Sequence, residues 1–260
     1  MSYQHILFEQ RGAVATVTLN RPERLNAFTN RMLHEVLEVI EKATFDEGIR
    51  CLVIRGAGRA FCSGDDLSGM GEYPRPIPPA TSPLSEYQHR LLKALRGLRK
   101  PVIASIHGYC HGMGEDAAMA CDLRIAAEGT RFGEPRILRG MHITTGATYL
   151  LPRMVGLPRA VELLMLGEAI DAQEALRIGL VHRVVLAEEL ESATMELAER
   201  LAAGPTKAYG VLKQQVYAEF DMNIDEALRD MVYNRYTEIA DREEGVRAFL
   251  EKREPKFTGR

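Results

Sequence analysis

No stretch of the sequence approaches the roughly 18 consecutive apolar residues that a membrane-spanning helix needs. Charge of one sign is not in excess either. The formal net charge is only −3, whereas a protein that binds duplex nucleic acid normally carries a basic excess. Residues 1–6 show no basic region followed by an apolar core, so we expect no signal peptide. These absences predict a cytoplasmic protein with no membrane span and no nucleic-acid partner.

Cysteine is scarce, and no two cysteines have the CxxC spacing of common metal sites. Most lie in or beside apolar runs, which is typical of small, reduced core residues in a cytosolic protein. We therefore expect neither a disulfide framework nor a bound metal. The GxSxG elbow of serine hydrolases and the GxxxxGK[ST] loop of nucleotide hydrolases are also missing, which argues against both classes. The cysteines are Cys51, Cys62, Cys110 and Cys121.

What the sequence does contain is a large apolar fraction, 46% of 260 residues, enough to bury a substantial core. Strand-like apolar patterns occur at 13–20, 51–54, 102–106, 123–126 and 181–185. Helical spacing occurs between them, at 32–40 with Thr29 as N-cap, at 84–98, at 157–166 and from Asp171 to Gly179. Alternating strands and helices predict an α/β domain over residues 1–200.

Beyond residue 186 the pattern changes to helices alone. Four helical segments are expected, at 187–201, 205–220, 225–239 and 241–252. Residues 201–260 therefore form a predicted helical domain whose own core is thin. Its apolar side chains must be buried either on the α/β body or on a neighbouring subunit, and we favour neighbouring subunits. The side chains concerned are Met222, Leu228, Met231, Val232 and Phe249.

The segment 100–116 has the pattern expected of a catalytic loop. The strand at 102–106 breaks at Gly108, a loop of small residues follows, and a helix opens with Glu115 and Asp116 in its first turn. Backbone N–H groups at a helix N-terminus can stabilise developing negative charge. A carboxyl group one turn into that helix can then move protons beside it. This pattern predicts an oxyanion hole with its acid/base group.

A second glycine-rich loop follows the strand at 51–54. It runs over residues 59–67, and its small residues are followed by Asp65 and Asp66. Asp66 is expected to fix the loop by accepting hydrogen bonds from backbone N–H groups. Residues 71–83 come next and are rich in proline, so they cannot hold regular structure. This segment is either a lid over the site or a plain connector.

The two loops resemble the oxyanion-hole loops of the crotonase superfamily, the enoyl-CoA hydratase/isomerase family. The likeness extends along most of the chain, and it is the ordered set of motifs that is specific. The similar segments include Leu-Asn-Ala at 25–27, Cys-Asp-Leu at 121–123, Phe-Gly at 132–133, Leu-Pro-Arg at 151–153, Asp-Ala-Gln-Glu-Ala at 171–175 and Gly-Leu-Val at 179–181.

The resemblance implies a crotonase-like spiral of β–β–α turns with a C-terminal helical domain at residues 201–260. It implies a homotrimer or a hexamer and an acyl-CoA substrate, with coenzyme A present only as part of that substrate and no other cofactor. The nearest activity is enoyl-CoA hydratase, a lyase of fatty acid metabolism. Alternatives are an isomerase, hydrolase or decarboxylase that uses Asp116 alone, or a non-catalytic protein that binds acyl-CoA or RNA.

By position, the resemblance makes the N–H groups of Ser63 and Met113 the two oxyanion-hole donors. The family usually has glycine at the position of Met113. A backbone N–H survives that change, and the methionine side chain is expected to narrow the acyl pocket. The remaining substrate-binding residues that the resemblance implies are Arg24, Leu25, Ala27, Gly64, Asp65, Asp66, Gly112 and His142.

The sharpest departure from the family concerns its two catalytic glutamates. The first aligns with Asp116, which is one methylene shorter, and the second aligns with Arg136. Arginine stays protonated and cannot act as an acid or base at neutral pH. Arg136 either grips a second carboxylate on the substrate, pairs with Asp116 and lowers its pKa, or forms a purely structural ion pair. Glu134 is a possible replacement for the missing carboxylate, and Glu115 is expected to interact with the helix dipole.

Overall fold

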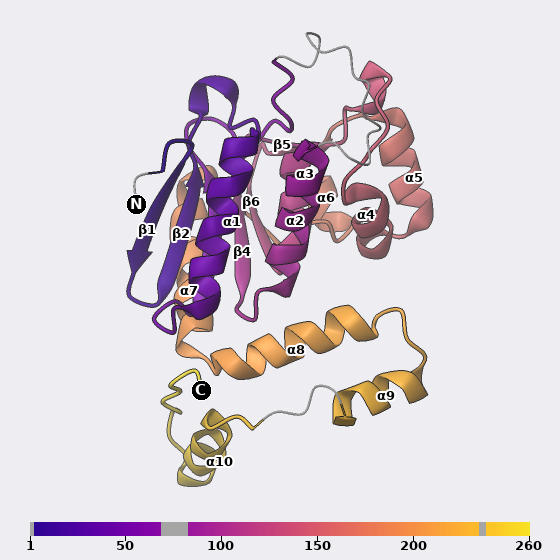
Figure 1. Cartoon of the computed structure of the whole chain (residues 1–260). Coiled ribbons are helices and arrows are strands. Elements are labelled where there is room, and N and C mark those ends of the chain that lie inside the picture. Colours follow the sequence, from indigo (N-terminus) through magenta and orange to yellow (C-terminus); the bar gives the residue numbers. More distant parts are fainter. Residues whose placement is uncertain (1–2, 69–82, 234–237) are drawn as a thin grey trace.

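A computed structural model describes residues 3–68, 83–233 and 238–260 of the chain, and its strands form two sheets (Figure 1). The larger sheet consists, in spatial order, of β1 (Ile6–Arg11), β2 (Val14–Leu19), β3 (Cys51–Gly56), β4 (Val102–Ile106), β6 (Leu123–Ala127) and β9 (Arg183–Val185). The smaller sheet consists of β5 (Tyr109–His111), β7 (Arg131–Gly133) and β8 (Ile170–Asp171).

The strands from β2 to β9 in the larger sheet run parallel. All five residues of β4 are buried, which explains its continuous apolar sequence, because a parallel strand is covered on both faces. The five strand positions predicted from the sequence are confirmed. β1 was not predicted. It pairs antiparallel with β2 at the edge of the sheet, and its mostly exposed, partly charged side chains hide the apolar pattern of a strand.

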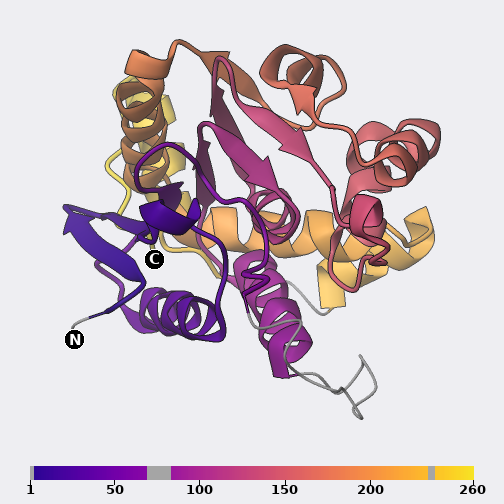
Figure 2. The same cartoon turned by 90° about the horizontal axis from the view of Figure 1, so that it is seen from above.

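Helices cover both faces of the larger sheet (Figures 1 and 2). On one face, α1 (Asn30–Phe45) and α2 (Pro83–Gly97) lie side by side over the main core. On the other face, α7 (Leu190–Ala203) packs a smaller core against the sheet. α1 begins as predicted, because the Thr29 side chain accepts a hydrogen bond from the Met32 N–H at 3.1 Å.

The middle of the chain forms repeating turns, each of which adds one strand to the larger sheet and one strand to the smaller sheet before a helix follows. β4, β5 and α3 (Met113–Ala120) form one turn, and β6 and β7 begin the next. This agrees with the predicted spiral of β–β–α turns. After β7 come α4 (Ala147–Val155) and α5 (Leu157–Leu166). α5 was predicted and α4 was not, since α4 contains Pro152, a residue that usually ends a helix.

The predicted capping of the next helix is confirmed. α6 (Ala172–Arg177) begins after Asp171, whose carboxylate accepts a hydrogen bond from the Glu174 N–H at 2.8 Å. An N-cap of this kind satisfies one of the free N–H groups of the first turn. The helix therefore starts at the residue that the sequence indicates, and it leads into β9 at the edge of the larger sheet.

The helical tail consists of α8 (Thr206–Glu219), α9 (Ile224–Tyr233) and α10 (Asp241–Glu251). Lys213 of α8 is buried, and its ammonium donates to the Asp122 carboxylate and to the Leu95 carbonyl, each at 2.8 Å. α8 is thus docked on the chain's own α/β body. Our expectation that the tail packs on neighbouring subunits is therefore wrong for α8.

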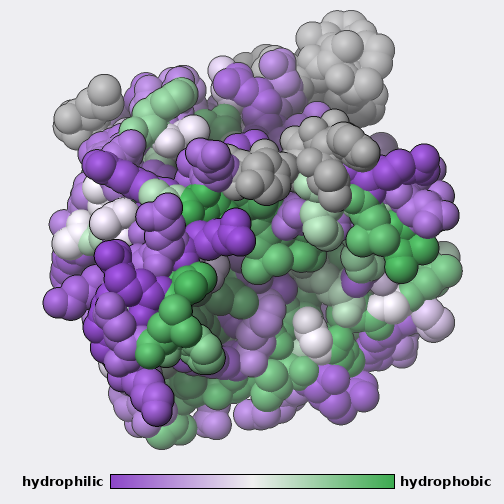
Figure 3. Space-filling model, turned by 90° about the horizontal axis from the view of Figure 1, so that it is seen from below, coloured by the Kyte–Doolittle hydropathy of each residue, from purple (hydrophilic) through white to green (hydrophobic). Residues whose placement is uncertain are grey.

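The rest of the tail keeps apolar side chains at the surface. Ile224 of α9 is 75% exposed, and Phe249 and Leu250 of α10 are 81% and 73% exposed. Seen from below, the molecule shows apolar side chains gathered in patches among polar ones (Figure 3). No described part of the chain covers these three side chains.

Candidate functional site

The two glycine-rich loops meet beside the N-terminus of α3, as the sequence predicts. A Cβ atom on Gly64 would lie 3.2 Å from the carbonyl oxygen of His111, and one on Gly112 would lie 3.5 Å from the Cα atom of Gly64. Both glycines have positive φ angles, 110° and 53°, which other residues rarely adopt. A Cβ on Gly114 would approach the Cβ of Cys62 to 2.6 Å. Glycine therefore permits the contact between the loops.

The two predicted oxyanion donors differ in their present partners. Met113 is the first residue of α3, so its N–H has no acceptor within the helix. The Met113 side chain is fully buried in the main core, so the core accommodates the extra volume of methionine at this position. The Ser63 N–H donates to the Leu25 carbonyl at 2.9 Å. A substrate oxygen would have to compete with that carbonyl for Ser63.

Asp116 lies at the centre of the site and is 0% exposed. Its Oδ2 atom accepts a hydrogen bond from Arg136 Nη2 at 2.6 Å and another from the Thr145 hydroxyl. Among the described residues, its Oδ1 atom has no hydrogen-bond partner. Oδ1 is directed toward Gly146, since a Cβ on that glycine would lie 3.5 Å from it. One oxygen of the carboxylate is thus held by two side chains, whereas the other is buried beside Gly146, with the backbone N–H of Ala147 lowering the pKa of the carboxyl group.

The Arg136 guanidinium joins several side chains in the same site. Its Nε and Nη2 atoms donate to both oxygens of Glu134, at 2.8 and 2.7 Å, in a bidentate pair. Nη1 donates to the Thr145 hydroxyl at 2.6 Å and lies 4.0 Å from Asp65 Oδ2. The sequence left three roles open for Arg136. The geometry supports the pairing of Arg136 with Asp116, and the pair is buried as a structural ion pair would be.

Negative charge exceeds positive charge around this arginine. Burial raises the pKa values of Asp116, Asp65 and Glu115, although Arg136 opposes the shift in each case. The expected lowering of the Asp116 pKa by Arg136 is present, but burial outweighs it, so the net direction is upward. Burial and the neighbouring Asp116 raise the pKa of Glu134 to about 7. The cluster can therefore exchange protons near neutral pH.

Glu115 lies in the first turn of α3, where we expected it to interact with the helix dipole. Its side chain is buried, and among the described residues its Oε2 atom has no hydrogen-bond partner. Burial, Glu134 and Asp116 together raise its pKa well above the usual value. A carboxyl group in such surroundings is most stable when it carries its proton.

The other predicted substrate-binding residues surround the first loop at different depths. Asp66 fixes the loop as expected, since it accepts the Ser68 N–H at 2.9 Å and pairs with Arg21 at 2.7 Å. Ala27 is buried and Leu25 has a positive φ angle of 49°. Two predicted residues are exposed, and no described contact joins them to the Asp116 cluster: Arg24 and His142.

Sequence reasoning missed two contributors to the site. Thr145 bridges Asp116 and Arg136, and Gln88 of α2 donates its amide to Asp65. The only sequence signal for Thr145 was a hydroxyl residue just before Gly146 and a new helix. Gln88 is buried although its type is usually exposed, and a sequence does not reveal that burial. The proposed lid at 71–83 lies almost wholly outside the described residues.

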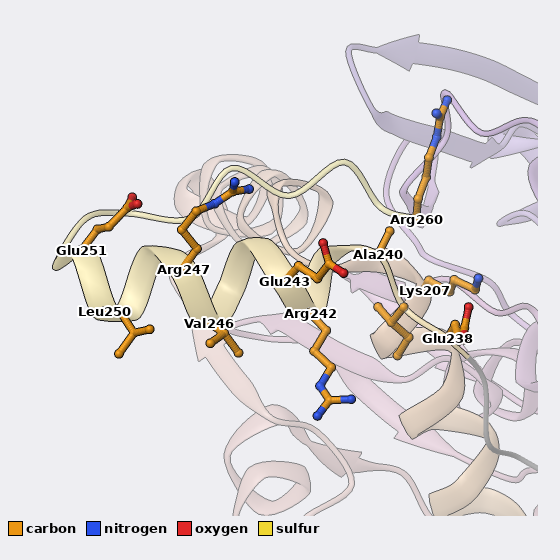
Figure 4. A pocket seen from close by; sticks show the side chains of 11 residues that line it. Lys207, Glu238, Ala240, Arg242, Glu243, Val246, Arg247, Leu250, Glu251 and Arg260 are labelled. Carbon is orange, nitrogen blue, oxygen red and sulfur yellow. The ribbon is translucent and has the colours of Figure 1, made fainter.

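A cavity of about 1020 Å³ lies elsewhere, beside α10 (Figure 4). Lys207 of α8 and Arg242, Val246 and Leu250 of α10 contribute to its lining, and no member of the Asp116 cluster does. Among the described residues, no group of three or more His, Cys, Asp or Glu side chains is arranged to hold a metal ion.

Comparison with known proteins identifies the family. The sequence model described as enoyl-CoA hydratase/isomerase matches residues 9–260. The chain belongs to the enoyl-CoA hydratase/isomerase family. It is 37% identical to a 1,2-epoxyphenylacetyl-CoA isomerase of Escherichia coli, over 99% of both chains. It is 34% identical to a short-chain-enoyl-CoA hydratase of Clostridium acetobutylicum, over 97% of both chains.

Solved structures agree with the family assignment. An enoyl-CoA hydratase subunit of Geobacillus kaustophilus superimposes with a TM-score of 0.90 at 34% identity and covers 99% of both chains. The predicted crotonase-like fold is confirmed. As a member of the enoyl-CoA hydratase/isomerase family, the chain is an acyl-CoA enzyme of the enoyl-CoA hydratase type. Within the described residues, no helix is long and apolar enough to cross a membrane.

Proposed function

We propose that this family member moves a double bond along the acyl chain of an enoyl-CoA, with Asp116 as the only acid/base residue. The observation that carries this proposal is the pair between Asp116 and Arg136. Arginine does not release its proton at neutral pH, so Arg136 cannot activate water as a second carboxylate would. Isomerisation requires only one group that removes a proton at one carbon and returns it at another.

In the proposed reaction, Asp116 Oδ1 removes a proton from C2 of a 3-enoyl-CoA, the saturated carbon between the thioester carbonyl and the C3=C4 double bond, and the proton later returned to C4 leaves the double bond between C2 and C3. The electron pair moves toward the thioester oxygen and forms an enolate, which the Met113 N–H stabilises together with the Ser63 N–H once Leu25 gives way. The protonated Asp116 then returns the proton at the other end of the conjugated system. Oδ2 keeps its bonds to Arg136 and Thr145 throughout, so the carboxyl group stays oriented. Such a proton transfer uses no cofactor beyond the substrate's own coenzyme A.

The test is to incubate the enzyme with a 3-enoyl-CoA and with crotonyl-CoA in deuterated water and to follow both by liquid chromatography coupled to mass spectrometry, which separates the 2-enoyl and 3-enoyl isomers of equal mass. Conversion of the 3-enoyl to the 2-enoyl thioester, with deuterium exchange and without gain of water, supports isomerisation. Deuterium exchange followed by thioester cleavage or loss of carbon dioxide contradicts it and indicates a hydrolase or decarboxylase. Binding of acyl-CoA without any reaction contradicts catalysis and leaves a binding protein.

Hydration is the second candidate, because a specific carboxyl group favours it. Glu134 contacts the same Arg136 Nη2 atom as Asp116 does, and its pKa is raised to about 7. If Glu134 replaced the missing family glutamate, water would add to crotonyl-CoA in the same experiment. We rank this reaction second because both oxygens of Glu134 are already bound to Arg136 and its side chain is only 1% exposed.

We also propose that the enzyme is a cytoplasmic homotrimer or hexamer. The exposed apolar side chains of α9 and α10 support self-association, and four buried free cysteines suit a reducing compartment. Light scattering coupled to gel filtration tests the assembly, because a single chain has a mass of 29.0 kDa. A mass three or six times larger supports the proposal, whereas a monomer contradicts it. Replacing Phe249 with aspartate should reduce the mass of the assembly.

A further inference from the structure

We infer that Glu134 is a positioning residue, which holds the Arg136 guanidinium in the place where it orients Asp116. The inference rests on the proposed function and adds a role that the reaction itself does not require. Glu134 accepts two hydrogen bonds from Arg136, at 2.8 and 2.7 Å, and its side chain is 1% exposed. A side chain so enclosed and so occupied acts through the arginine and not on the substrate.

The local sequence favours this pairing. Glu134 and Arg136 flank Pro135. A proline fixes its own φ angle and biases the preceding residue toward an extended backbone, so the segment Glu134–Pro135–Arg136 has little freedom. The carbonyl oxygen of Arg136 also accepts hydrogen bonds from the backbone N–H groups of Arg139 and Met141, at 3.0 and 3.1 Å. The backbone under the guanidinium is therefore fixed, and Glu134 fixes the side chain.

Without Glu134, the guanidinium would keep only its contacts with Asp116 and Thr145 through Nη1 and Nη2, and Nε would lose its acceptor. A planar guanidinium is held best by a bidentate carboxylate. Asp65 lies 4.0 Å from Nη1 and competes for the same charge. Loss of Glu134 should therefore allow Arg136 to swing away from Asp116 Oδ2, either toward Asp65 or out of the site.

The pKa of Asp116 distinguishes a positioning role of Glu134 from that of a simple neighbouring charge, because the two roles predict opposite shifts when Glu134 is removed. The charged groups near Asp116 are Asp65 from the first loop, Glu115 from α3, and Glu134 and Arg136 from the segment after β7. If Glu134 were only a negative neighbour, its removal would lower the pKa of Asp116. If it positions Arg136, its removal weakens the contact with the cation, and the pKa of Asp116 rises.

The experiment is a double-mutant cycle of Glu134→Gln and Arg136→Gln, read by 13C NMR titration of aspartate-labelled enzyme. Asp116→Asn assigns the resonance, and thermal unfolding checks each fold. Glutamine matches glutamate in size, but it removes the charge and replaces one acceptor oxygen with an NH2 donor, so the bidentate pair with Arg136 cannot form. We expect E134Q to raise the pKa of Asp116 by about one unit in the wild-type background and to lower it, or leave it unchanged, in the R136Q background. The acid limb of the rate profile should move in parallel.

A lowered pKa of Asp116 in E134Q with Arg136 intact would overturn the inference, as would an unchanged one. An equal rise in both backgrounds would also overturn it, because Glu134 would then act independently of Arg136. If R136Q does not fold, the sign of the shift in E134Q alone still decides. The titration does not depend on turnover. An enzyme inactive toward every acyl-CoA would contradict the proposed reaction and leave this test intact.

Discussion

The Nη2 atom of Arg136 lies 2.6 Å from Oδ2 of Asp116, and both side chains are buried. A carboxylate with a fixed cation on one oxygen accepts a proton more readily on the other oxygen, whose lone pairs are not occupied by that cation. The cation also favours the ionised form that a base needs, against the burial that favours the protonated form. Arg136 is therefore best understood as a built-in counter-ion for Asp116.

The first prediction concerns Asp116 itself. Asp116→Asn keeps the shape and removes the acid/base group, so deuterium exchange into an acyl-CoA should fall by about 10²- to 10⁴-fold. Stability should change little, because removing a carboxyl group whose pKa is raised by burial offsets the loss of its contact with Arg136, which keeps the bidentate pair with Glu134. Asp225→Asn, an exposed residue of α9, is the matched control. Retention of wild-type exchange by D116N would show that Asp116 is not the base.

The second prediction concerns stability and pH. Arg136→Met leaves Asp116 and Glu134 buried without their cation, which should cost about 3–5 kcal/mol at pH 8. Without the arginine, the folded-state pKa values of both carboxyl groups rise further above their unfolded values. Groups of this kind stabilise the fold at low pH, and that stability is lost as the pH rises. The penalty should therefore shrink at pH 5, where the carboxyl groups can take up protons.

Urea denaturation of wild type and R136M at pH 5 and pH 8 measures this effect. Comparing the two proteins at each pH cancels the titration of groups that both share, such as His182, whose pKa is lowered to about 4. An equal penalty at both pH values would contradict the argument and would mean that the two carboxyl groups are not strongly coupled to Arg136. A larger penalty at pH 5 would contradict its sign.

The third prediction concerns substrate choice. A substrate carboxylate would find the Arg136 donors already occupied by Glu134, Asp116 and Thr145, with Asp65 close by. Placing like charges together costs several kcal/mol. The kcat/KM for an enoyl-CoA with a terminal carboxylate should therefore be at least about tenfold below that of the unsubstituted thioester of equal length. Faster turnover of the dicarboxylic thioester would instead make Arg136 a substrate clamp.

Much of the fold could be predicted from the sequence, because the burial of its strands and the capping of its helices leave recognisable residue patterns. The fully buried β4 has the continuous apolar pattern of a covered parallel strand, and Thr29 and Asp171 mark the starts of α1 and α6. Prediction was poorer where tertiary context decides the structure. β1 is polar because it lies at an edge, and α8 docks on the body through the buried Lys213, a residue type that sequence rules place at the surface.

The site was predictable in its parts but not in its contacts. Asp116 and Arg136 stand out in their motifs, yet their 2.6 Å contact depends on how α3 and the segment after β7 are placed in space, although the two residues are twenty positions apart in sequence. Thr145 and Gln88 become recognisable only when that placement is known. The balance of effects on the pKa of Asp116 was misjudged for the same reason, since the extent of its burial cannot be read from a motif.

The last prediction concerns the glycine that brings the loops together. A methyl group on Gly114 would lie 2.6 Å from Cys62 Cβ and 2.9 Å from the Cys62 carbonyl oxygen, so Gly114→Ala must push the first loop away from α3. We expect a loss of about 1–3 kcal/mol in stability. Activity should fall by about 10²-fold, since a displacement near 1 Å between Ser63 and Met113 spoils their shared geometry.

Gly97→Ala is the matched control, because nothing lies within 4 Å of its Cβ position at the exposed end of α2. Its stability should stay the same or rise slightly, since alanine favours helix over glycine by about 1 kcal/mol. Urea denaturation and the deuterium-exchange assay measure both variants. If G114A lost stability but kept full activity, the close contact between the first loop and α3 would be needed for the fold and not for catalysis. That result would mean that the reaction does not need the N–H groups of Ser63 and Met113 in one fixed arrangement.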